Sequence, residues 1–191
     1  MTALLMPAMT APTGLELYGE PAGTLAVTLR KYLAVLNNIG LSNGTLSVMS
    51  IALRGGILVS NITFTTGGQV KAGGTHGWYC LLNSSRMVVA VTADQTDAAT
   101  VWGTLNTPYT LPVTVPYLVP VMGLYYLGIC VTATTPGQPM GGPNGATGIS
   151  NSAPALCGTI AGAPAAPPAL GTTMAAISAA GVSDRFYAYV S

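Results

Sequence analysis

The chain has 191 residues, of which 50 % are hydrophobic and only 6 % are charged, and its formal net charge is +1. An ordinary soluble domain carries about 25 % charged residues. Because the chain has no basic block, we expect no nucleic-acid partner. Its longest apolar run, residues 121–133, is shorter than the roughly 20 residues of a membrane-spanning helix, so we expect no membrane partner either.

The N-terminal segment, residues 1–21, is predicted to be an extended arm. It contains three prolines and shows no consistent period. Such a terminus is commonly disordered, and the alternative is an arm that lies along a neighbouring subunit. The first ten residues contain no Lys or Arg, so we expect no export signal.

Strands are predicted in the first half of the chain wherever apolar and polar residues alternate or β-branched residues gather. Within residues 45–53, Leu46, Val48 and Ile51 are expected to point inward. The Asn43-Gly44 pair predicts a tight turn before this strand, and the glycine pairs at 67–68 and 73–74 are expected to bound a loop. The predicted strands are 24–29, 45–53, 57–65, 77–82 and 86–92, the last two joined as a hairpin through 83–85.

The second half contains one predicted helix and three further strands. Asp94 or Asp97 could cap a short helix at residues 94–101. Residues 134–173 are rich in Pro, Gly and Ala and are predicted to form long ordered loops. The strands are 109–115, 124–132 and 185–190, the last with Phe186, Ala188 and Val190 on one face and Tyr187 and Tyr189 on the other.

About eight short strands separated by turn residues predict an all-β fold, an antiparallel β-sandwich or jelly roll. We expect one such domain over residues 22–191, preceded by the arm. Its surface must consist mainly of small polar and apolar groups, because so few charges are present. Interface cores are depleted in charge, so the composition predicts a subunit of an assembly rather than a free enzyme.

Candidate catalytic and metal-binding residues are few. Cys80, Cys130 and Cys157 are an odd number without a close pair, which indicates free thiols in a reducing cytosol. His76 is the single histidine. Cys80 follows four residues later, a spacing that places both side chains on the same face of a strand. We expect it to hydrogen-bond the loop backbone rather than to act as a base or metal ligand.

Asp94 and Asp97 are the one carboxylate pair. They could bind Ca²⁺ or hydrolyse a glycoside, but a helix cap is the simpler interpretation. We therefore assign no catalytic, cofactor-binding or metal site. Ten aromatic side chains could form a carbohydrate platform, but a role in the core and in subunit contacts is favoured: Trp78, Tyr79, Trp102, Tyr109, Tyr117, Tyr125, Tyr126, Phe186, Tyr187 and Tyr189.

Several segments, taken in order, are similar to one class of protein. They are residues 55–64 (GGILVSNITF), 75–82 (THGWYCLL), 90–96 (AVTADQT), Trp102, 107–110 (TPYT), 123–131 (GLYYLGICV) and 187–191 (YAYVS). This order resembles small β-sandwich structural domains in the virions of tailed bacteriophages, especially those that infect actinobacteria. The resemblance covers roughly residues 55–131 and the last five residues, and it carries no catalytic residues.

The resemblance implies a non-enzymatic virion protein, made in the cytoplasm of the bacterial host. We favour a capsid decoration (cement) subunit, a homo-oligomer and specifically a trimer, that binds the major capsid protein. The alternative is a tail-fibre or baseplate domain, a minor tail protein that binds a host cell-surface glycan. A secreted sugar-binding module or small hydrolase is a third class, and it would need an exposed aromatic row or an acidic pocket.

Overall fold

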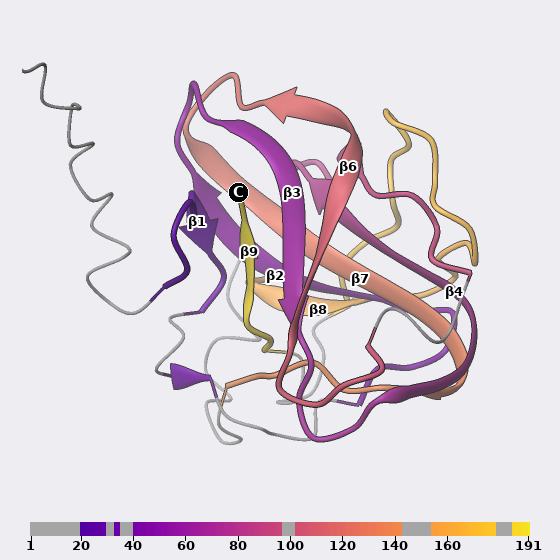
Figure 1. Cartoon of the computed structure of the whole chain (residues 1–191). Helices are drawn as coiled ribbons and strands as arrows, with labels where there is room; N and C mark the ends of the chain where they lie inside the picture. The colour runs from indigo at the N-terminus through magenta and orange to yellow at the C-terminus, as the bar shows by residue number, and fades with distance from the viewer. Residues whose placement is uncertain (1–19, 30–32, 35–39, 97–101, 143–153, 179–184) are drawn as a thin grey trace, which may run out of the picture.

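The computed structural model of the chain describes residues 20–29, 33–34, 40–96, 102–142, 154–178 and 185–191. In these ranges the chain forms strands and no α-helix, and the predicted all-β fold with two antiparallel sheets is confirmed (Figure 1). The strands are β1 (Ala26–Val27), β2 (Leu46–Leu53), β3 (Leu58–Thr65), β4 (Lys71–Leu82), β5 (Val88–Val91), β6 (Pro108–Leu118), β7 (Gly123–Pro136), β8 (Cys157–Ile160) and β9 (Ala188–Val190).

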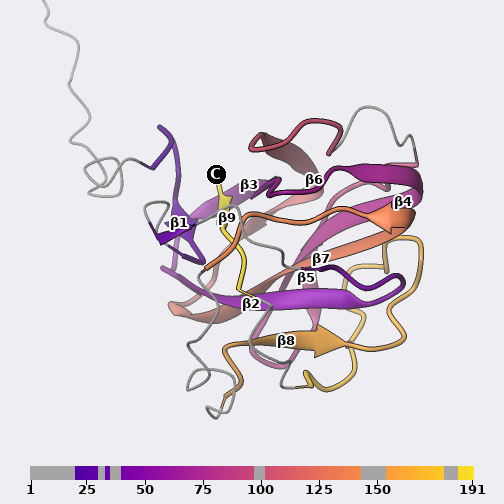
Figure 2. The same ribbon diagram turned by 90° about the horizontal axis from the view of Figure 1, so that it is seen from below.

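The two sheets have the strand orders β1-β9-β3-β6 and β5-β4-β7-β2-β8. Four antiparallel pairings are nested along the chain: β4 with β5, β3 with β6, β2 with β7 and β1 with β9. The chain is therefore one long antiparallel ribbon that reverses at the β4–β5 hairpin and rolls into two layers. Figure 2 shows β3 and β6 in one layer, with β2 and β8 on the other side of the molecule.

Apolar side chains that alternate along the strands fill the space between the sheets. The Phe64 ring centroid lies 4.6 Å from that of Tyr79 and 5.1 Å from that of Phe186. The alternation predicted near the C-terminus is confirmed. Phe186, Ala188 and Val190 belong to this core, and Tyr187 and Tyr189 form a separate cluster on the other face.

The outer face of the five-stranded sheet is also buried. Residues 154–178 first contribute the edge strand β8 and then fold back over this face, where Trp78 donates a hydrogen bond from Nε1 to the carbonyl oxygen of Ala165 at 2.9 Å. The second apolar cluster formed there includes Leu46, Trp78, Cys80, Leu82, Ala163 and Met174. This sheet therefore separates two apolar layers.

Strand β2 contributes to both layers. Leu46, Val48 and Ile51 are buried as predicted, but they do not share one face. Because successive side chains of a strand point to opposite faces, Leu46 and Val48 enter the outer cluster, whereas Ile51 and Leu53 enter the core between the sheets.

Two predicted turns are confirmed. In the Asn43-Gly44 turn, the Thr45 N–H donates to the carbonyl of Ser42 at 3.2 Å, and Gly44 has a φ of 64°. In the β4–β5 hairpin, the N–H of Asn83 donates to the carbonyl of Met87 at 3.0 Å.

Two predictions about loops are wrong in part. Residues 67–70 do lie between β3 and β4, but the glycine pair at 73–74 lies inside β4, where Gly73 has a φ of 58° and the register with β7 shifts just after it, between Gly74 and His76. A side chain there would clash, because a Cβ at Gly73 would lie 2.5 Å from Thr134 Oγ1. The Pro/Gly/Ala-rich stretch 134–173 includes the end of β7 and all of β8, which pairs with β2.

The predicted helix and arm fall partly on residues that the structure does not describe. Residues 94–96 are not helical, and residues 97–101 lie outside the described ranges. Residues 1–19 of the predicted arm also lie outside them. Glu20 is buried and accepts a hydrogen bond from the Tyr187 hydroxyl at 2.6 Å, which ties the start of the described chain to its end.

Close packing of residues 154–178 on the sheet predicts the effect of adding a methyl group at Gly158. A Cβ there would lie 2.2 Å from the Ser178 carbonyl oxygen and 2.6 Å from Ile177 Cγ2. Gly158→Ala should lower the free energy of unfolding by about 1–3 kcal/mol, as overpacking does. Gly40→Ala is the matched control, because nothing lies within 4 Å of its Cβ position. Equal urea midpoints for the two variants would contradict this packing.

Candidate functional site

His76 and Asp94 form a hydrogen-bonded pair at the surface. His76 Nδ1 lies 2.5 Å from Asp94 Oδ2, and the N–H of Gly77 donates to Asp94 Oδ1 at 3.0 Å. The expected bond from His76 to the loop backbone is therefore wrong, and so is a helix cap at Asp94. The carboxylate instead ties β4 to the chain that follows β5. Asp97 lies outside the described residues, so the proposed carboxylate pair is not placed.

His76 and Cys80 share a face of β4 but cannot act together. Four residues of strand separate their Cα atoms by about 13 Å. Burial raises the pKa of the Cys80 thiol, and nearby Cys130 raises it further. A buried thiol with a raised pKa is a poor nucleophile, so this part of β4 lacks an activated Cys–His pair.

The three cysteines are buried, free thiols, as the prediction of free thiols requires. Burial raises the pKa of Cys130 to about 11, and the negative charge of Asp94 adds to the effect. Cys80 and Cys130 both belong to the apolar cluster under residues 154–178. They pack as small apolar groups.

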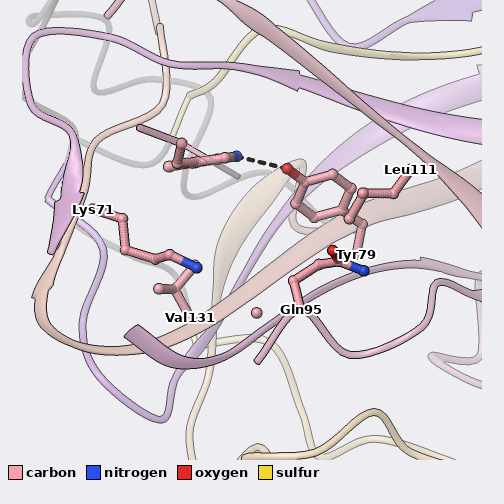
Figure 3. A pocket seen from close by; sticks show the side chains of 7 residues that line it. Lys71, Tyr79, Gln95, Leu111 and Val131 are labelled. Atoms are coloured by element: carbon pink, nitrogen blue, oxygen red, sulfur yellow. Dashed lines mark hydrogen bonds between the residues drawn. The ribbon is translucent and has the colours of Figure 1, made fainter. Parts of the chain in front are cut away.

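A small cavity lies between the sheets near the start of β4. The Tyr79 hydroxyl accepts a hydrogen bond from Trp102 Nε1 at 2.6 Å, and Lys71 and Gln95 lie on the opposite side (Figure 3). The cavity holds ≈ 10 Å³, which is room for about one water molecule. It is too small for an organic substrate. Among the described residues, no group of three His, Cys, Asp or Glu side chains could hold a metal ion.

The aromatic side chains form core rather than a platform. Tyr109 and Tyr117 are half-buried, and the other eight of the ten candidates are buried. The interpretation as core aromatics is confirmed, and an exposed row built from these ten rings is excluded.

Charged side chains are almost absent from the described surface. Of the six charged residues in the described ranges, Glu20, Lys71 and Arg185 are buried, Arg86 and Asp94 are half-buried, and Arg54 alone is exposed. Arg54 makes no ion pair or hydrogen bond with any part of the described chain. No helix in those ranges has the length and apolar character needed to cross a membrane.

Four exposed apolar side chains gather at the end of the sandwich where Arg54 lies. We call Leu58, Leu118, Val121 and Met122 the apolar tip; they are between 50 % and 78 % exposed. Leu58 and Leu118 pair across β3 and β6. The β2–β3 and β6–β7 turns lie side by side (Figure 1), and the N–H of Gly56 donates to the carbonyl of Val119 at 2.8 Å.

The apolar tip was not predicted from the sequence. Val121 and Met122 were counted within one long apolar run. Their flanking residues, Pro120 and Gly123, are turn formers and could have shown that the two side chains lie in an exposed turn.

Comparison of the chain with protein-family models, with curated proteins and with solved structures finds no match. Its own residues and their geometry are therefore the basis for assigning a function.

Loss of the Asp94 carboxylate should destabilise the fold. Asp94→Ala leaves the part-buried Gly77 N–H without its acceptor and should cost about 1–3 kcal/mol. Asp94→Asn keeps an acceptor oxygen and should cost less. Urea unfolding of both variants measures the difference, and an unchanged midpoint for Asp94→Ala would contradict a linking role for the carboxylate.

Alkaline pH should destabilise the fold through the buried thiols. Folding raises the pKa of Cys130 from 9.0 to about 11, so the folded state favours the neutral thiol. The contribution of the neutral Cys130 thiol to the free energy of unfolding is complete below pH 9 and is lost as the pH rises through 11. The melting temperature of the native chain should therefore fall more steeply over this range than that of Cys130→Ala. An equal fall of the melting temperature with pH in the two proteins would contradict the raised pKa of Cys130.

Proposed function

We propose that the protein is a non-enzymatic structural subunit on the surface of a bacteriophage virion, a capsid decoration subunit that binds the major capsid protein and stabilises the head. The observation that carries this proposal is the uncharged surface, on which Arg54 is the one exposed charge among the described residues. A free monomer needs charge for solubility, whereas the cores of protein interfaces are depleted in it.

The nested strand pairing supports a virion role by analogy of fold. We infer that the rolled ribbon, with its pairings β4–β5, β3–β6, β2–β7 and β1–β9, is a jelly roll. Viral capsid domains use this architecture, and so do lectins. Fold alone does not determine function, so the choice between these classes rests on the surface.

The surface and the side-chain chemistry favour the structural role. Sugar-binding sites are built on exposed rings, whereas the candidate aromatic rings here are buried or half-buried. The potential nucleophiles Cys80 and Cys130 are buried, and His76 is bonded to Asp94. These groups hold the fold together. We infer a homotrimer as the assembled form, because shared apolar contacts can then cover the uncharged surface.

Gold labelling of virions with an antibody against the chain tests the proposal. The particles come from the host that produces the chain, and antibody pre-adsorbed with purified protein is the control. Label distributed over the head is expected. Label confined to the tail would replace the decoration role by the tail-fibre or baseplate role. Unlabelled particles, with the protein left in the soluble lysate, would overturn both.

A further inference from the structure

The apolar tip and Arg54 form a surface that lacks a partner within the described chain. Each of the four apolar side chains of the tip is at least 50 % exposed. Arg54 makes no ion pair with the described residues. A matching partner would present apolar side chains around one carboxylate. A second tip would not match, because tip-to-tip contact brings two Arg54 guanidinium groups together, and like charges in an interface are repulsive.

The N-terminal segment of the chain has the matching composition. Residues 1–19 contain one charged side chain, Glu16, which stands between Leu15 and Leu17. The acidic side chains of the described residues are already engaged, Glu20 with Tyr187 and Asp94 with His76. Glu16 therefore combines a carboxylate with flanking leucines, as the tip requires.

The position of Glu20 favours a second copy over the same chain. Glu20 is bonded to Tyr187, beside the end of β3, whereas Arg54 precedes the beginning of that strand. The length of β3 between them is about 20 Å. Glu16 is four residues before Glu20. Four extended residues span at most about 14 Å between Cα atoms, so Glu16 of the same chain would reach Arg54 only with this segment fully extended along β3 and both side chains stretched toward each other, whereas a second copy meets no such limit.

We propose that the N-terminal segment of one copy binds the apolar tip of a second copy, with Glu16 paired to Arg54. The inference rests on the assembly role proposed above and identifies the contact that makes the assembly. Because segment and tip are different surfaces, the contact is head-to-tail. Such contacts close into rings when the rotation between copies permits, as a trimer requires.

Charge reversal tests the pairing in the purified full-length protein. Arg54→Glu and Glu16→Arg should each weaken self-association roughly tenfold or more, and the double variant should recover it. Met122→Lys should weaken association, whereas Leu105→Lys, at an exposed leucine of the β5–β6 loop, is the matched control. Light scattering over a dilution series measures the mass. Unchanged association in both single variants, or no recovery in the double variant, would overturn the pairing.

Mixed-chain cross-linking tests whether the contact joins two copies. Glu16→Cys chains mixed with Arg54→Cys chains should form mixed disulfide dimers under mild oxidation, because the proposed contact brings the two new thiols together. The three native thiols are buried and should not compete. Glu16→Cys mixed with Leu105→Cys is the control and should not. Cross-links only within a chain that carries both new cysteines, or only between two chains of the Arg54→Cys variant, would overturn the inference. If mixed dimers form but the gold-labelling experiment leaves the virions unlabelled, the contact is upheld and only the virion role is overturned.

Discussion

Burial of both faces of the five-stranded sheet is the constraint on which the rest of the fold depends. Seven successive residues of its central strand, β7, are buried, so one face needs the second sheet and the other needs residues 154–178. The hydrogen bond from Trp78 to Ala165 fixes that outer cover. The apolar residues of the chain therefore fill two cores. This explains why half of the chain is hydrophobic although no segment is expected to enter a membrane.

A chain with so little charge must also prevent its sheet edges from pairing with other chains, and it does so with loops and prolines. On the edge strand β5, the N–H of Val88 donates to the carbonyl of Thr172. On β6, an edge strand of the four-stranded sheet, Pro112 lies opposite Asn61, which exchanges both backbone bonds with Ser191. The backbone of Pro112 therefore faces the open edge and offers no donor there. Protection of these two edges is consistent with the proposal that the chain associates through side-chain contact at the apolar tip.

Much of the fold could be predicted from local patterns, and the errors have physical causes. Alternation placed most strands, and the Asn43-Gly44 turn followed from the backbone freedom of glycine. The same argument failed at Gly73 and Gly74, because glycines can also lie inside a strand beside a bulge. Strand β8 was missed because its four residues lie in a Pro/Gly/Ala-rich stretch. The link from Asp94 to His76 joins residues 18 positions apart, and no spacing rule predicts such a contact.

We infer that further copies of the chain cover its weakly charged surface. Sedimentation equilibrium of the purified full-length protein at micromolar concentration tests it most directly, since it measures mass without labels or variants. We expect a trimer. A chain that remains a stable, soluble monomer under these conditions would contradict this inference, because its surface would then be hydrated with few charges and no neighbouring copies.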